Sequence, residues 1–182
     1  MLKNEYFYDD IILLKYKISD VEERLSALRD SINDLSPWLS FFKKESMEKD
    51  NKTWLECDQE SWKNGTEYSF KVTNIFDYKI LGEVRINHID KRHNFANLTY
   101  WVRSGENGKG IAYKAAKAIL KIVFDDLKLN RLEIFMSTEN LGSKRIAEKI
   151  GAKREGLMRN RIVAGTEKQD AYLYSVIPED MK

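Results

Sequence analysis

The sequence is poor in cysteine, histidine and proline, and each shortage excludes a class of protein. Of its 182 residues, one is cysteine, two are histidine and two are proline. Cys57 has no partner for an internal disulfide, and a zinc site of four cysteines or a histidine-rich metal site cannot be built. We therefore expect a protein that holds no metal.

Long apolar runs and an excess of one charge are also missing. No stretch approaches the roughly 20 apolar residues of a membrane-spanning helix, and residues 1–10 lack the basic and apolar segments of a secretory signal. Lys and Arg number 31 against 29 Asp and Glu, a net charge of +2, which does not suggest a nucleic-acid-binding face. We expect a cytoplasmic protein with no membrane partner and no direct nucleic-acid partner.

Apolar residues are plentiful enough for one packed core. Hydrophobic residues make up 42% of the chain and aromatic residues 12%, which argues against disorder. The length suits one domain and would be cramped for two. Because no repeat, low-complexity stretch or linker interrupts the chain, we expect a single domain over residues 1–182.

Apolar periodicity predicts the element order β, α, α, β, β, β, α, β, α, β, β. A strand over residues 6–14 precedes a helix that Ser19 opens, in a capping box with Glu22. Period-two alternation then predicts an antiparallel meander, followed by two strand–helix units and a closing hairpin around Ala164-Gly165. The later elements span residues 46–64, 68–73, 83–88, 95–102, 111–127, 131–136, 141–150, 154–163 and 168–177. The fold class is α+β, with a mostly antiparallel central sheet and flanking helices.

A glycine-rich turn links the last strand of the meander to the helix that follows. Gly105, Gly108 and Gly110 lie within six residues of each other. Glycine lets successive N–H groups point the same way and lets a ligand approach the backbone closely. The start of the helix adds partial positive charge. The order strand, glycine turn, helix therefore predicts an anion site suited to a pyrophosphate.

Three kinds of phosphate site compete for this turn. A Walker loop requires Ser or Thr after Lys109, where Gly110 stands. A dinucleotide fingerprint requires a small residue in place of Tyr113 and a parallel βαβ unit. A coenzyme A pyrophosphate loop requires only the amides and no metal. Taken alone, the motif is also compatible with a simple turn that binds nothing.

Several further short motifs lie before and after the glycine-rich turn in the sequence. They are Ser36-Pro37-Trp38-Leu39, Tyr100-Trp101-Val102, Asn107-Gly108-Lys109-Gly110-Ile111, Thr138-Glu139-Asn140 and Glu155-Gly156. With these motifs the sequence resembles the GNAT superfamily of N-acetyltransferases, and within it the Rim-type branch, which contains ribosomal-protein N-terminal acetyltransferases. The resemblance covers residues 67–176 well and the N-terminal helices more loosely. It implies a GNAT-like mixed sheet with a V-shaped splay between the fourth and fifth predicted strands.

The resemblance also implies acetyl-CoA as cosubstrate. Pantetheine would bond backbone groups near Trp101 and Val102, where an N–H would stabilise an oxyanion. Asn140 would contact the pantetheine arm in addition to capping the next helix, or would only cap it. The backbone N–H groups that would hold the pyrophosphate are those of Asn107, Gly108, Lys109, Gly110, Ile111 and Ala112.

The catalytic residues depart from the pattern of the superfamily. Many members have a general-acid tyrosine seven residues after the asparagine, where this chain has Ala147. Ser143 is the nearest replacement and would lie near the thioester sulfur, unless it is only a surface serine in a first helical turn. Asn97 stands where Rim-type relatives often have a glutamate base. Glu83, acting through water, is the substitute base, unless it is a solvent-facing strand residue.

The implied reaction is direct attack of a primary amine on the thioester in a ternary complex. A weak base favours an α-amine, with a reference pKa of ~7.7–8.0, over lysine at ~10.4. We therefore expect a peptide or protein N-terminus as acceptor, bound by the N-terminal helices and the closing hairpin. Acetylation of a small-molecule amine (polyamine or antibiotic) and a non-catalytic acetyl-CoA-binding regulatory module stay open. A homodimer is one option for assembly.

Overall fold

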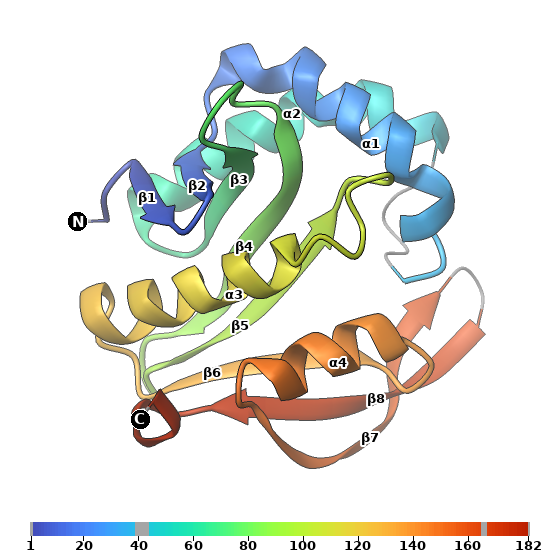
Figure 1. Ribbon diagram of the computed structural model, residues 1–182. Helices are drawn as coiled ribbons and strands as arrows, with labels where there is room; N and C mark the ends of the chain where they lie inside the picture. The colour runs from blue at the N-terminus through green and yellow to red at the C-terminus, as the bar shows by residue number, and fades with distance from the viewer. Residues whose placement is uncertain (1, 39–43, 165–166, 182) are drawn as a thin grey trace.

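The computed structural model describes residues 2–38, 44–164 and 167–181 of the chain, and an eight-stranded sheet is its centre (Figure 1). The strand order is β1-β2-β3-β4-β5-β6-β8-β7, and every neighbouring pair is antiparallel except β5 and β6. The sheet confirms the predicted α+β class. The strands are β1 (Glu5–Tyr8), β2 (Ile11–Lys15), β3 (Tyr68–Asn74), β4 (Ile80–Asp90), β5 (Phe95–Val102), β6 (Arg131–Ser137), β7 (Lys153–Ala164) and β8 (Glu167–Val176).

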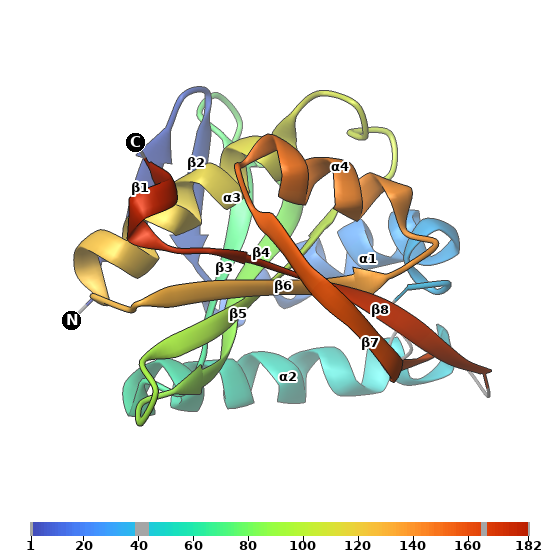
Figure 2. The same cartoon turned by 90° about the horizontal axis from the view of Figure 1, so that it is seen from below.

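Helices lie on both faces of the sheet, and two apolar clusters hold them there (Figure 2). On one face, α3 and α4 pack on the sheet through the larger cluster, in which small alanines let α3 approach the strands closely. On the other face, Leu25, Leu28 and Leu55 of α1 and α2 pack against Trp101. The helices are α1 (Val21–Leu35), α2 (Lys44–Asn64), α3 (Ile111–Lys121), which the π-helical turn η2 (Ile122–Asp126) extends, and α4 (Leu141–Lys149). None of the helices in these described ranges is long and apolar enough to cross a membrane.

Strands β5 and β6 pair over a short distance and then separate. Their parallel ladder has three residue pairs and ends where Asn97 lies opposite Glu133. Beyond this point β5 stays paired with β4 as far as Val102, while β6 stays paired with β8 as far as Ser137. The facing edges of the two strands therefore have no strand partner past the last pair. This is the V-shaped splay that the family resemblance implies, and the structure confirms it.

Two local predictions at the N-terminus are wrong. Residues 6–14 form a hairpin of two strands, because Asp9 adopts a left-handed φ of 55° and reverses the chain. The first helix does not begin with a Ser19–Glu22 capping box. A short 3-10 turn, η1 (Ile18–Asp20), precedes α1, and the Asp20 carboxylate accepts a hydrogen bond from the N–H of Lys17 at 2.8 Å.

Candidate functional site

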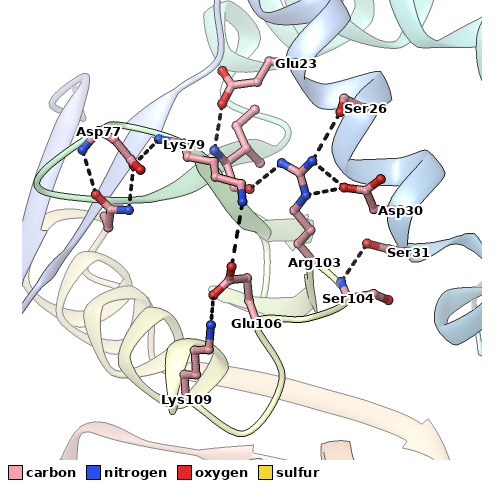
Figure 3. A network of polar contacts seen from close by, with 12 residues as sticks. Glu23, Ser26, Asp30, Ser31, Asp77, Lys79, Arg103, Ser104, Glu106 and Lys109 are labelled. Carbon is pink, nitrogen blue, oxygen red and sulfur yellow. Dashed lines mark hydrogen bonds and ion pairs between the residues drawn. The ribbon is translucent and has the colours of Figure 1, made fainter.

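The first half of the glycine-rich loop (residues 103–110, between β5 and α3) is fastened to α1 by side chains (Figure 3). Arg103 donates from Nε to Asp30 at 2.8 Å and from Nη2 to the Ser26 hydroxyl at 3.2 Å. The N–H of Ser104 donates to the Ser31 hydroxyl at 3.0 Å. Sequence reasoning missed these anchors, although the polar residues Ser26, Asp30 and Asp34 recur at helical spacing and form a stripe on α1.

The second half of the loop has free backbone donors. Within the described residues, the N–H groups of residues 107–112 have no hydrogen-bond partner. The N-cap of α3 is Gly110, which has no side chain that could accept a hydrogen bond from them. Gly108 and Gly110 have φ of 80° and 79°, and a Cβ on either would meet no atom within 4 Å. Lys109 turns its ammonium back to Glu106 at 2.7 Å. A row of donors at a helix start therefore faces open space, which suits an anionic ligand.

The chain leads into this loop along the unpaired edge of β5. Trp101 is buried against α1 and α2, and Val102 is half-buried. Gly82 lies opposite Val102 on β4, where a Cβ would come within 2.3 Å of the Trp101 carbonyl oxygen. Only glycine allows this close approach, so β4 sets the position of the Trp101–Val102 backbone.

Asn140 and Ser143 lie together at the start of α4, as predicted. Asn140 is the N-cap and its Oδ1 accepts a hydrogen bond from the N–H of Ser143 at 2.9 Å. The Ser143 hydroxyl in turn lies 2.9 Å from the Tyr100 hydroxyl, which also donates to the Ser143 carbonyl at 3.2 Å. Tyr100 thus joins β5 to α4 across the splay. Burial raises the pKa of Tyr100 to about 12, so it is a hydrogen-bond donor at neutral pH.

Glu83 is not a solvent-facing residue, because only 3% of it is exposed. Its Oε2 accepts hydrogen bonds from Nε of Arg24 at 2.9 Å and from the Tyr16 hydroxyl at 3.0 Å. The Arg24 guanidinium also lies over the Trp54 ring, 3.6 Å from its centroid. Both bonds fall on one oxygen, so Oε1 has no hydrogen-bond partner within the described residues. Glu83 lies opposite Trp101 in the β4–β5 ladder, beside the splay.

A second buried carboxylate lies near this ion pair, and sequence reasoning missed it. Asp58 of α2 is 5% exposed, and its Oδ2 is buried with no hydrogen-bond partner. Burial raises the pKa of Asp58 to about 6, and the nearby charge of Glu83 adds to this rise. No sequence signal distinguishes Asp58 from the exposed acids of the same helix.

Asn97 occupies the point where β5 and β6 separate. It is 3% exposed, and its amide donates to Oδ1 of Asn87 at 2.8 Å and to the Thr99 hydroxyl at 3.2 Å. Its own Oδ1 is buried without a partner. Asn97, which stands where the resemblance implies a glutamate, is therefore built into a network of neutral side chains.

A groove of about 680 Å³ opens beside Asn97, on the sheet face where α2 lies. We call it the vertex groove, because it lies where the two strands meet. It is lined by His88, Ile89, Asp90, Lys91, Arg92, Phe95, Asn97, Glu133, Phe135 and Arg161.

Two residues of the predicted motifs lie outside the described part of the chain. They are Leu39 of the Ser36-Pro37-Trp38-Leu39 motif and Gly165 of the closing hairpin. Within residues 2–38, 44–164 and 167–181, no group of three or more His, Cys, Asp or Glu could hold a metal ion.

Comparison with known proteins assigns this arrangement to a family. A family model described as "Acetyltransferase (GNAT) domain" matches residues 10–153. A protein of Bacillus subtilis (strain 168) named "Probable N-acetyltransferase YjcK" is 27% identical over 184 residues, covering 99% of this chain and 98% of its own.

Two solved structures show the same fold. The ribosomal-protein-S5-alanine acetyltransferase from Vibrio fischeri is 21% identical, with a TM-score of 0.88 and coverage of 98% of both chains. RimL, a ribosomal L7/L12 alpha-N-protein acetyltransferase in complex with coenzyme A, is 16% identical, with a TM-score of 0.90 and coverage of 98% of this chain and 99% of its own.

Proposed function

Because this chain belongs to the family of GNAT acetyltransferase domains, we propose that it transfers the acetyl group of acetyl-CoA to the α-amino group of a peptide or protein N-terminus. One observation carries the proposal. The free amides of residues 107–112 continue directly into the unpaired edge of β5, and that edge ends at Asn97 beside the vertex groove. A long ligand with an anionic middle and a reactive end fits such a path.

The loop residues fit the pyrophosphate of the coenzyme. Its negative charges need several donors, and the N–H groups of Asn107, Gly108, Lys109, Gly110, Ile111 and Ala112 offer them without any side chain that blocks the approach. Backbone groups of Trp101 and Val102 would bond the pantetheine arm, with Asn140 beside it. Acetyl-CoA supplies the activated acetyl thioester.

In the reaction the new N–C bond forms as the C–S bond breaks. The amine loses one proton, and the departing thiolate gains one. Ser143 would donate a hydrogen bond to the sulfur, and its Oγ would accept one from Tyr100, whose hydroxyl proton then points to Oγ and not to the Ser143 carbonyl. A thiol with a reference pKa of ~8.5 leaves with little help, so a hydrogen bond to the sulfur can replace the missing tyrosine acid.

Glu83 is the base in this proposal, acting through a water molecule. It is the buried carboxylate opposite Trp101, and its Oε1 is free to accept a hydrogen bond. Glu83→Gln keeps the shape of the side chain and removes its basicity. We expect kcat/KM to fall at least about tenfold below pH 7 and less above pH 8, where more of the amine is already neutral. A loss that is equal at all pH values would contradict the assignment.

The acceptor is an α-amine because such an amine needs little help from a base. At neutral pH the neutral fraction of an N-terminus exceeds that of lysine by roughly a hundredfold or more. The names of the V. fischeri enzyme and of RimL, which refer to ribosomal proteins and to an α-amine, support a protein acceptor.

The test uses two matched peptides, one with a free N-terminus and blocked lysine, the other with the reverse. We expect the first to have the higher kcat/KM near pH 7. Preference for the lysine peptide would overturn the choice of acceptor. We also expect no metal requirement, because the loop lacks the Walker hydroxyl. Activity that is abolished by a chelator and restored by a divalent cation would contradict this.

A further inference from the structure

The shape of the vertex groove comes from two interruptions in the strands around it. The ladder between β4 and β5 shifts register between Asn87 and Asp90, and that between β7 and β8 shifts between Met158 and Ile162. His88 and Asn160, at these two irregularities, have left-handed φ of 50° and 53°. Such bulges turn side chains out of the regular alternation and are frequent next to active sites. Here they border the groove from two sides.

The acidic side chains of the groove are already occupied. Oδ1 of Asp90 accepts hydrogen bonds from the N–H groups of Arg92 and His93, both at 2.8 Å. Oε1 of Glu133 accepts a hydrogen bond from Nε of Arg131 at 2.8 Å. Glu133 is therefore paired with a cation outside the groove lining, while Asp90 bonds backbone N–H groups and keeps its negative charge.

The basic side chains are not neutralised in this way. Arg92 and Arg161 make no ion pair or side-chain hydrogen bond within the described residues, and Lys91 donates only to the Asn64 carbonyl, at 3.3 Å. The Arg161 guanidinium lies over the Phe135 ring, 4.1 Å from its centroid. Stacking of this kind holds the planar group while leaving its N–H donors free. Lys91, Arg92 and Arg161 thus outnumber the one carboxylate that no cation pairs, Asp90, so the groove has an excess of positive charge and unused donors.

The inner end of the groove is neutral and polar. Asn97 lines it at the last β5–β6 pair, and its buried Oδ1 lacks a partner. An amine held between this end of the groove and Glu83, which lies four residues along β4 from the Asn97 partner Asn87, would lie on the path proposed for the coenzyme. The residues that follow this amine in a peptide would then extend past Arg161 and Arg92. Arginine in a stacked position is suited to bidentate bonding of carboxylates.

We infer that the vertex groove binds acidic side chains, Asp or Glu, in the first few residues after the acceptor's N-terminal amine. The inference rests on the proposed function, since it requires a peptide acceptor. It goes further because it specifies the charge of the preferred acceptor sequence and the groove residues that recognise this charge.

The experiment compares peptides with a free N-terminus that carry Asp or Glu at the second to fourth positions with the same peptides carrying Asn or Gln. We expect kcat/KM to favour the acidic peptides by about three- to tenfold at low salt, as for two partly exposed ion pairs, and less at high salt. Arg161→Gln should remove most of this preference by lowering kcat/KM for the acidic peptides toward the value for the neutral ones. Arg159→Gln, the same charge change on the same strand but outside the groove lining, should leave the preference intact.

A charge reversal keeps the test independent of folding defects. Arg161→Glu should shift the preference toward peptides with Lys at the same positions. Equal kcat/KM for acidic and neutral peptides in the unmodified enzyme would overturn the inference and leave the proposed function standing. If no peptide with a free N-terminus is acetylated while another amine is, the proposed function fails and the inference fails with it.

Discussion

The glycine-rich loop and the polar cluster beneath α1 and α2 (Arg24, Asp58, Glu83, Asn87 and Asn97) differ in how their hydrogen-bonding groups are paired. In the loop, backbone N–H groups have no partner within the described residues and face open space. In the cluster, side chains are buried and pair with one another, as Arg24 does with Glu83 and Asn97 with Asn87. The loop thus offers a row of donors to a ligand, while in the cluster most side-chain groups are paired and only single acceptors, such as Oδ1 of Asn97 and Oδ2 of Asp58, have no partner within the described residues.

This difference indicates how each region tolerates change. A site made of backbone donors depends on conformation, so only residues that set φ or block the space are critical. A site made of paired side chains depends on each partner, because a buried charge or amide that loses its partner is costly. The three following predictions test this contrast.

The largest effect is expected where a new side chain blocks access to the loop amides. Gly108→Val or Gly110→Val adds a branched side chain in the open space and strains a backbone with φ near 80°. We expect the Kd for acetyl-CoA, measured by calorimetry on folded protein, to rise more than about 100-fold, as for the loss of several charge-assisted hydrogen bonds.

Gly151→Val is the matched control for this change. Gly151 has a φ of 94°, and a Cβ at this position would meet no atom within 4 Å, but the residue follows α4 and lies outside the loop. The substitution should cost stability without changing coenzyme affinity. Unchanged affinity in both loop variants would exclude the loop as the pyrophosphate site.

A smaller effect is expected at Asp58, in the side-chain cluster. Its pKa is about 6 in the folded protein against about 3.9 unfolded, so the folded state binds the proton more tightly. The contribution of Asp58 to the free energy of unfolding should therefore be largest below pH 4 and fall by about 3 kcal/mol as pH rises above 6. Asp58→Asn stays neutral and should be more stable than the unmodified protein at pH 7, with no such fall.

Urea unfolding between pH 4 and pH 8 measures this effect. Asp50→Asn, on the exposed side of the same helix, is the control and should leave the pH profile unchanged. If Asp58→Asn and the unmodified protein show the same pH dependence, the buried carboxyl does not titrate as proposed.

The smallest effect is expected at Tyr100, which joins β5 to α4 across the splay. Tyr100→Phe removes the hydroxyl bonded to Ser143 and should lower kcat about tenfold, with the Kd for acetyl-CoA changed less than about twofold. The double variant with Ser143→Ala should be no slower than either single variant, since both act through one hydrogen bond.

Tyr174→Phe serves as the structural control for Tyr100. It removes another tyrosine hydroxyl, which donates to Glu148 at 3.2 Å, from a residue outside the proposed site. Its kcat should be unchanged. Additive losses in the Tyr100 and Ser143 variants would argue against a shared role.

Motifs made of neighbouring residues could be predicted without the fold. The glycine-rich loop, the Asn140 cap and the position of Ser143 in the first turn of α4 all depend on contacts within a few residues. The splay between β5 and β6 was predicted only through the family resemblance, because no local pattern marks where two strands separate.

Contacts between distant residues could not be predicted in this way. Arg24 and Glu83 are 59 residues apart, and Tyr100 and Ser143 are 43 apart. The alternation of Glu83 with apolar neighbours predicts that its side chain is exposed. It is buried instead, because helices cover both faces of β4. The Ser19–Glu22 capping box failed for a different, local reason, since the 3-10 turn before α1 provides its own hydrogen bond between Lys17 and Asp20.

By itself, the sequence determined the backbone part of this protein's site. Glycines at positions of positive φ, followed by a helix start, leave donors unpaired whatever surrounds them, because local dihedral angles set the direction of each N–H. The tertiary structure alone decided which charged side chains are buried and paired, and which side chains line the vertex groove. Burial and partner choice depend on which strands lie side by side, and the arginines near Asn97 come from segments that meet only in the folded sheet.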